Sequence, residues 1–159
     1  MSTREMKASP DFETTILVRD TCLCLHAQRA ARALARQFDV ALKPVGITSG
    51  QFSLLMSLNR PAPPKLGSVA ALLAMDRTTL TANLKPLERR GLVKTANDPA
   101  DGRARLLQLT PAGRTILAKA VPIWRHLHAE IEKVLSDPDH LRSELNLISR
   151  FDIEGGVAG

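Results

Sequence analysis

The chain has few aromatic residues: no tyrosine, one tryptophan and four phenylalanines among 159 residues. Proteins that hold single-stranded nucleic acid stack the bases on aromatic rings, so the composition argues against a single-strand binding platform. Two cysteines are too few for a disulfide framework or a cysteine-rich zinc site. Paired catalytic carboxylates, a nucleophilic triad and a phosphate-binding loop have no signature either. We therefore expect a protein that is not an enzyme and has no cofactor.

Long apolar runs are also missing. No stretch approaches the roughly 18 residues that a membrane span needs. The opening segment, MSTREMKASPDFETT, lacks the apolar centre of a signal peptide. These features predict a cytoplasmic protein with no membrane partner.

Positive charge is in excess. The net charge is +6 and the isoelectric point is near 9.9, which favours a polyanionic partner. Between Asp76 and Arg105, seven Lys/Arg stand against four Asp/Glu, so half of the excess falls within less than a fifth of the chain. This placement predicts a nucleic-acid-binding surface in that segment.

The segment begins with a predicted amphipathic helix, with Asp76 as N-cap and Gly91 just past its end. Leu80, Leu84 and Leu87 recur at helical spacing and predict a buried face. The rest of the helix surface is small, polar and basic: Arg77, Thr78, Thr79, Thr81, Ala82, Lys85 and Arg89. Such a face suits base edges in the major groove of double-stranded DNA, and a merely solvated face is the alternative.

Pro86 lies inside this helix, where it removes a backbone hydrogen bond and predicts a bend. Two interpretations stay open, since the bend either helps the helix to follow a groove or is tolerated near a helix end. Pro122 predicts a similar kink in a later helix.

A hairpin follows the helix, with predicted strands at 92–97 and 105–110 around the turn DPADGRA. Gly102 is free to take a positive φ in that turn. Arg103 lies at the tip and Arg105 just after it, where an arginine can enter a narrow minor groove. The alternative role of Arg103 is an ion pair with Asp98 or Asp101, and both roles are compatible. Helix, turn, helix and hairpin in this order predict a winged helix.

The flanking segments are predicted as helices. We expect a flexible tail at 1–13, one long helix at 14–42, a break at 43–46, and a second helix capped by Thr48 with Gln51. A proline-rich connector at 60–65 contributes a short strand beside the hairpin, and a third helix packs Val69, Leu72 and Leu73. Thr110-Pro111 and Asp137-Pro138 start two more helices, the first with an apolar stripe that reaches Val134. A flexible tail follows at 154–159.

The chain resembles the MarR (multiple-antibiotic-resistance regulator) family of winged-helix transcription factors. The resemblance rests on the helix block 76–93, on Asp98-Pro-Ala-Asp-Gly-Arg103, and on Leu109-Thr-Pro-Ala-Gly113. It implies a homodimer that binds a palindromic operator, acts more often as a repressor, and is often released by a small effector. The expected fold is mainly α with a small β-hairpin wing (α+β). A winged-helix domain at 48–110 lies between dimerisation helices at 14–42 and 111–153.

The same resemblance suggests how the regulator senses a signal. An aromatic or phenolic effector needs an apolar wall with one or two cations, which His26, Arg29, Phe52 and Trp124 are able to supply. Hydroperoxide sensors of the family carry a reactive cysteine near the start of the first helix, within a Leu-Cys-aromatic-Ala run, and Leu23-Cys24-Leu25-His26 is similar in position. Cys22 and Cys24 are therefore the candidate redox residues. Those sensors place tyrosines near the sulfur, which this chain lacks.

Other interpretations of these residues remain open. Each effector candidate also suits a core or surface position, and the cysteines also suit a small apolar role. Within a helix, residues i and i+2 diverge, which disfavours both a Cys22–Cys24 bridge and a His126–His128 metal pair. Cys22, Cys24, His26, His126, His128 and His140 are thus not expected to form a metal site. The alternative for the whole protein is a winged-helix interaction module that binds no operator.

Overall fold

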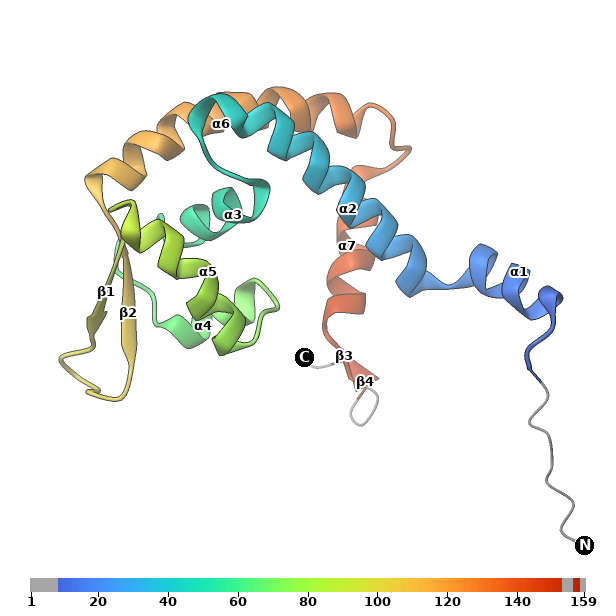
Figure 1. Cartoon of the computed structure of the whole chain (residues 1–159), viewed down its shortest axis with the longest axis horizontal. Helices are drawn as coiled ribbons and strands as arrows, with labels where there is room; N and C mark the ends of the chain where they lie inside the picture. The colour runs from blue at the N-terminus through green and yellow to red at the C-terminus, as the bar shows by residue number, and fades with distance from the viewer. Residues whose placement is uncertain (1–8, 153–155, 158–159) are drawn as a thin grey trace, which may run out of the picture. The chain divides into compact units, whose positions relative to one another are not determined.

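The structure is a computed structural model that describes residues 9–152 and 156–157. The chain divides into two compact units, Met1–Gln37 and Phe38–Gly159. The first unit holds α1 (Phe12–Thr21) and most of α2 (Leu23–Leu42), and Figure 1 shows the elements along the chain.

The predicted single helix at 14–42 is wrong, because Cys22 interrupts it with an extended backbone (ψ 106°). The N–H of Cys22 still donates to the Val18 carbonyl, which closes α1. The N–H of Leu25 then donates to Cys22 Sγ at 3.4 Å, so the thiol caps the start of α2. A one-residue break leaves the apolar periodicity intact, so the pattern could not reveal it. The predicted tail at 1–13 is also too long, since Asp11 caps a helix that begins at Phe12, and residues 1–8 lie outside the described residues.

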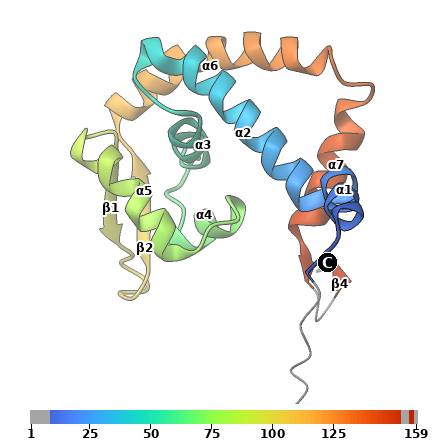
Figure 2. The ribbon, with the colours of Figure 1, turned by 45° about the vertical axis from the view of Figure 1, so that its right-hand side comes forward.

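The second unit is mainly helical with one well-formed hairpin, as predicted. After the end of α2 come a 3-10 turn (Lys43–Val45), α3 (Ser49–Ser57), α4 (Leu66–Leu72), α5 (Arg77–Arg89), β1 (Val93–Asn97), β2 (Arg105–Leu109), α6 (Pro111–Glu132), α7 (Pro138–Ser149), β3 (Phe151–Asp152) and β4 (Gly156–Val157). In both ribbon views α3, α4 and α5 lie together beside the β1–β2 hairpin, and α6 leads away from it (Figure 1 and Figure 2). This is the winged-helix arrangement.

Leucines dominate the core of this unit. Leu55 on α3, Leu80 and Leu87 on α5, and Leu107 on β2 are each 0% exposed, and Leu84 is also buried, which confirms the predicted inner face of α5. One predicted core position is wrong, because Leu72, at the last turn of α4, is 59% exposed. Val134, where the predicted apolar stripe ends, lies beyond the end of α6 and is 81% exposed.

The hairpin pairs Val93 with Leu109 through Asn97 with Arg105. The proline-rich connector adds a short third edge, as predicted: Lys65 bridges Leu106, and the Leu107 N–H donates to the Pro64 carbonyl at 2.9 Å. Gly102 does not use its freedom to take a positive φ; within the described residues, Gly46, Gly91 and Ala74 have a positive φ. The tip closes instead by hydrogen bonds from Asp101 N–H to Asp98 O and from Ala104 N–H to Asp101 O, a pattern that type I turns make without a left-handed residue.

The predicted helix caps are confirmed. Thr48 and Gln51 form a capping box at α3, and the Asp76, Thr110 and Asp137 side chains each accept a backbone N–H at the start of α5, α6 and α7. Thr110 also donates its hydroxyl proton to the Gly91 carbonyl at 2.7 Å, which ties the start of α6 to the end of α5. These local signals depend on a few adjacent residues, so they can be read directly from the sequence.

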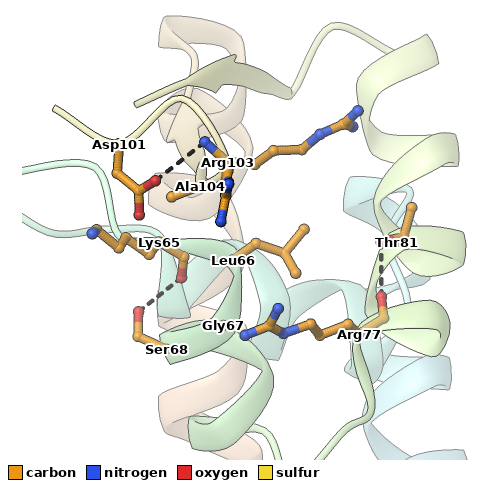
Figure 3. A pocket seen from close by; sticks show the side chains of 10 residues that line it. Lys65, Leu66, Gly67, Ser68, Arg77, Thr81, Asp101, Arg103 and Ala104 are labelled. Carbon is orange, nitrogen blue, oxygen red and sulfur yellow. Dashed lines mark hydrogen bonds between the residues drawn. The ribbon is translucent and has the colours of Figure 1, made fainter. Parts of the chain in front are cut away.

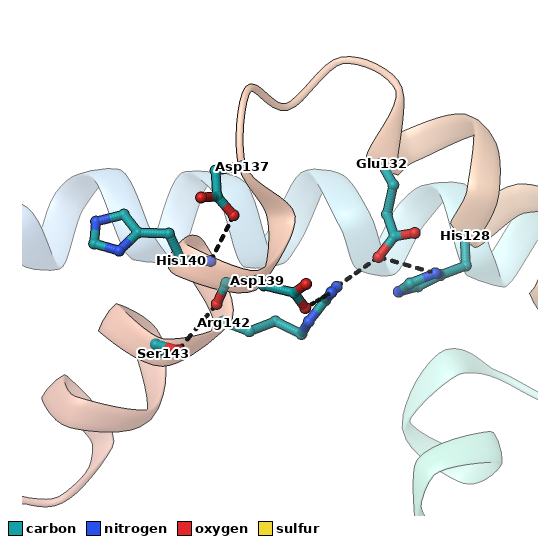
Figure 4. Close-up of polar contacts among 7 residues, drawn as sticks. All are labelled: His128, Glu132, Asp137, Asp139, His140, Arg142 and Ser143. Atoms are coloured by element: carbon teal, nitrogen blue, oxygen red, sulfur yellow. Dashed lines mark hydrogen bonds and ion pairs between the residues drawn. The ribbon is translucent and has the colours of Figure 1, made fainter.

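A charged cluster joins α6 to α7 (Figure 4). Arg142 binds Glu132 and Asp139, each at 2.5 Å, and His128 Nδ1 lies 3.7 Å from Glu132. None of the residues of α7 is buried.

The predicted flexible tail at 154–159 is wrong for Gly156–Val157, which pair with Phe151–Asp152. Residues 153–155 and 158–159 lie outside the described residues.

Across the described part of the chain, no helix is both long enough and apolar enough to cross a bilayer.

Gly113 is the glycine that the packing requires most. A Cβ there would lie 2.3 Å from the Leu92 carbonyl oxygen and 2.7 Å from Leu109 Cδ1. We expect Gly113→Ala to lower the free energy of unfolding by about 1–3 kcal/mol, measured by urea unfolding. The matched control is Gly50→Ala, where a Cβ on α3 meets no atom within 4 Å. Alanine should stabilise that helix by about 0.5–1 kcal/mol, and equal shifts in both variants would contradict the packing argument.

The cap of α5 should respond to pH. The Thr79 hydroxyl and then the Thr79 N–H, both bonded to the Asp76 carboxylate, lower the pKa of Asp76. The unfolded pKa is about 3.9, so the cap stabilises fully above roughly pH 5 and is lost as the pH falls through the lower, folded pKa. We expect the stability advantage of wild type over Asp76→Asn to shrink between about pH 5 and pH 2 in urea unfolding. A pH-independent difference would exclude the carboxylate charge as its source.

Candidate nucleic-acid interface

The buried leucines of α5 determine which side of the helix faces solvent. Because Leu80, Leu84 and Leu87 face the core, the opposite side of the helix stands in solvent. The predicted contact residues on it are exposed, apart from the half-buried Thr81: Arg77, Thr78, Thr79, Ala82, Lys85 and Arg89. The structure therefore presents the predicted face of α5, apart from Thr81, to solvent.

The three threonine hydroxyls on this helix differ in what they bind. Thr79 Oγ1 donates to Asp76 Oδ2 at 2.6 Å, and Thr81 Oγ1 donates to the Arg77 carbonyl at 2.7 Å. The Thr78 hydroxyl has no hydrogen-bond partner within residues 9–152. Thr78 is therefore the one of the three whose proton is available to a ligand, a distinction that the sequence did not reveal.

A surface hollow of about 680 Å³ separates the start of α5 from the wing (Figure 3). Its walls carry Lys65, Leu66, Gly67, Ser68, Arg77, Thr81, Asp101, Arg103, Ala104 and Arg105. The Arg77 guanidinium lies beside Gly67, where an added Cβ would come within 3.2 Å of Arg77 Nη2. The hollow therefore holds four cations and one carboxylate, a balance suited to phosphate groups.

At the wing tip the guanidinium of Arg103 is unpaired within the described residues, although its backbone N–H donates to Asp101 Oδ1 at 3.2 Å. The predicted alternative, an ion pair with Asp98 or Asp101, is therefore not formed. Asp98 pairs instead with Lys65, whose Nζ lies 3.5 Å from Asp98 Oδ2. Arg105 is exposed on the first residue of β2. Both wing arginines are thus free to meet a ligand.

A shallower hollow of about 350 Å³ lies on α5 around Pro86, between Ala82, Lys85, Glu88 and Arg89. Glu88 accepts a hydrogen bond from the Thr95 hydroxyl of β1, so this acid is held by the wing.

Sequence reasoning missed Lys65 and Ser68 as part of the charged surface. A lysine and a serine around the start of a short helix were the available signal.

The candidate effector residues are distributed over both units. The rings of Phe52 and Trp124 stack with centroids 6.2 Å apart, and Trp124 also stacks on His128 at 4.6 Å. His26 and Arg29 are exposed on the part of α2 that belongs to the first unit. From the sequence, His128 was considered only as a metal ligand, and its stacking on Trp124 was not predicted.

The cysteines are both free thiols, Cys22 half-buried and Cys24 exposed. Cys24 Sγ accepts a hydrogen bond from Gln28 Nε2 at 3.2 Å. Because Cys22 lies at the break before α2, the expectation that two residues inside one helix diverge does not apply to this pair. In the region described, no group of three His, Cys, Asp or Glu side chains is placed to hold a metal ion.

Comparison with known proteins agrees with this geometry. The family model described as a winged helix DNA-binding domain matches residues 47–113. The transcriptional regulator MosR of M. tuberculosis, crystallised in complex with DNA, is 36% identical with a TM-score of 0.76, over 81% of this chain and 94% of that one.

Two further proteins are similar over most of their length. A mutant MarR of E. coli, complexed with operator DNA, is 26% identical with a TM-score of 0.70, over 88% of this chain and 96% of that one. The organic hydroperoxide resistance transcriptional regulator of Bacillus subtilis is 30% identical, over 70% of this chain and 75% of that protein. The chain belongs to the MarR family of winged-helix transcriptional regulators.

Proposed function

We propose that the protein is a homodimeric repressor that binds a palindromic double-stranded operator. In this proposal α5 enters the major groove and the wing reaches the adjacent minor groove. The observation that carries it is the gathering of Lys65, Arg77, Arg103 and Arg105 around one hollow between the helix and the wing. Fixed cations at that place neutralise phosphates, while the exposed face of α5 contacts base edges.

The dimer is proposed to form through residues 14–42 and 111–153, on either side of a DNA-binding domain at 48–110. Support comes from α7, where Leu141, Leu145 and Ile148 are 40%, 47% and 51% exposed. Apolar side chains of this kind gain stability when a second copy covers them. Two copies related by a two-fold axis set their half-sites about one helical turn apart, roughly 10–10.5 base pairs.

A small aromatic or phenolic effector is proposed to release the operator. The stacked rings of Phe52, Trp124 and His128 supply an aromatic wall for it. Repression follows from occupancy, since a dimer bound across two half-sites blocks access to the promoter.

The deciding experiment is selection of bound duplexes from a random pool, followed by transcription of a template that carries the selected site. We expect a palindrome with half-sites about one turn apart and reduced transcription when the protein is added. Increased transcription would make the protein an activator. Failure to enrich any duplex would favour the interaction module that binds no operator.

We expect threonines of α5 with a free hydroxyl proton to contribute more to operator binding than threonines whose proton is bonded within the helix. Thr78→Val should weaken binding to the selected site by about 1–3 kcal/mol and relax specificity at one base pair, because its free hydroxyl reads a base. The matched control is Thr81→Val, whose proton is already bonded to the Arg77 carbonyl, and which should lose less. Equal losses would contradict this division.

Arg103→Ala should act differently from Thr78→Val. It removes a phosphate-neutralising cation, so affinity should fall and the slope of log K against log salt should decrease by about one. The measurement is a gel shift at several salt concentrations. An unchanged affinity and slope would remove the wing tip from the proposed contact.

A second proposed activity is release of the operator by thiol oxidation. It is favoured by the position of Cys22, whose sulfur caps α2 at the break between two helices, and by the similarity to a hydroperoxide resistance regulator. An organic hydroperoxide converts a thiol into a sulfenic acid and is itself reduced to an alcohol. We expect hydroperoxide to weaken operator binding about tenfold in wild type and not in Cys22→Ser. Equal loss in both proteins would exclude Cys22 as the sensor.

A further inference from the structure

Asp98 is the acidic residue at which the wing tip begins, and its side chain is only 11% exposed. Both backbone groups of Asp98 are used: its N–H donates to the Ala104 carbonyl at 2.9 Å, and its carbonyl accepts from Asp101 N–H at 3.2 Å. One carboxylate oxygen accepts from the Ala100 N–H at 2.9 Å. The other lies 3.5 Å from Lys65 Nζ. Asp98 therefore closes the tip and ties it to a residue outside the hairpin.

Lys65 joins two elements in turn. Its backbone bridges Leu106 on β2. Its carbonyl accepts the N–H groups of Ser68 and Val69 at 3.0 and 3.2 Å, and so forms the N-terminal end of α4. The Lys65–Asp98 pair thus runs from the wing tip to the start of α4, and α4 packs against α5. A loop carrying exposed cations is held at one place on the helical core.

We propose that Asp98, acting through Lys65, is a positioning residue for operator binding. The pair sets where Arg103 and Arg105 lie across the hollow from Arg77, so that the three cations meet phosphates and minor groove together. This inference rests on the proposed function, because it takes the hollow to be the DNA-facing surface. Asp98 itself is nearly withdrawn from solvent, so it acts through Lys65 and the backbone of the wing tip.

When Asp98 is removed, a positioning role and the loss of its charge predict opposite changes in operator affinity. Asp98 is a negative charge on a surface that binds a polyanion, so its charge alone opposes binding, and its removal alone should raise the affinity. A positioning role predicts that its removal lowers the affinity. Asp98→Asn separates the two effects, since asparagine retains an oxygen for the Ala100 N–H and loses the charge that faces Lys65.

The test is a double-mutant cycle on the selected operator with Asp98→Asn, Lys65→Gln and the double variant. Binding of the wild-type protein is measured first. A wild-type protein that binds no duplex contradicts the proposed function, so that failure is distinguished from a failure of the positioning role of Asp98. We expect Asp98→Asn to weaken binding about three- to fivefold and to lower the salt slope, because a partly exposed pair holds the wing only moderately. In the Lys65→Gln background it should cause no further weakening.

Two control variants test whether the coupling is specific to the Lys65–Asp98 pair. Lys94→Gln removes another exposed wing cation, one that forms no ion pair in residues 9–152, and should show no coupling to Asp98→Asn. Lys65→Arg keeps a cation opposite Asp98, so Asp98→Asn should weaken binding in that background, as it does with Lys65, and not in the Lys65→Gln background. Asp98→Ser also keeps an oxygen for the Ala100 N–H and lacks the charge, so it replaces Asp98→Asn if that variant fails to fold. Stronger binding when the charge of Asp98 is removed, or equal weakening in the Lys65→Arg and Lys65→Gln backgrounds, would overturn the proposal.

Discussion

The close approach between the start of α6 and the end of α5 is the contact on which the rest of the unit depends. Thr110 donates its hydroxyl proton to the Gly91 carbonyl and its N–H to the Leu92 carbonyl, at 2.7 and 3.1 Å. Gly113 leaves no space for a side chain against Leu92. Because Leu92 and Thr110 flank the two strands, this contact fixes the base of the wing and the last turn of α5 together. The charged hollow keeps its form because its two sides share this base.

Three of the four cations of the hollow contribute no ion pair to the stability of the described part of the chain. Arg77, Arg103 and Arg105 form no ion pair within residues 9–152, and one acid, Asp101, lines the hollow with them. Unpaired like charges at close range repel one another, and a phosphate backbone relieves the repulsion. Lys65 is the exception among the four, since it is paired with a nearly buried carboxylate. The structure thus separates one cation that holds the wing from three that are free to bind.

The parts of the fold that depend on neighbouring residues were predicted well. The caps at Thr48, Asp76 and Thr110 and the buried leucines of α5 follow from local hydrogen bonds and helical periodicity. The break at Cys22 was not predicted, because one changed ψ angle leaves that periodicity unaltered. Leu72 was placed in the core by the same pattern, but α4 ends at that residue, and its side chain faces solvent.

The candidate site shows a similar division. The exposed face of α5 follows from its period, so its residues could be named from the sequence. The Lys65–Asp98 pair joins segments that are distant along the chain, and only the folded hairpin brings them together. The stacking of Phe52 on Trp124 depends in the same way on the packing of α3 against α6. Spacing alone does not reveal contacts of this kind.

The three threonines of α5 show what the helix is able to discriminate. The hydroxyl protons of Thr79 and Thr81 are held by Asp76 and by the Arg77 carbonyl, so toward a ligand these oxygens act as oriented acceptors. Thr78 retains a proton and is able to act as a donor. Guanine presents acceptors in the major groove, whereas cytosine and adenine present amino donors, so a fixed acceptor and a free donor distinguish different bases. In the proposed complex, three residues of one type would therefore offer two kinds of recognition, and the internal hydrogen bonds of the helix decide which residue offers which.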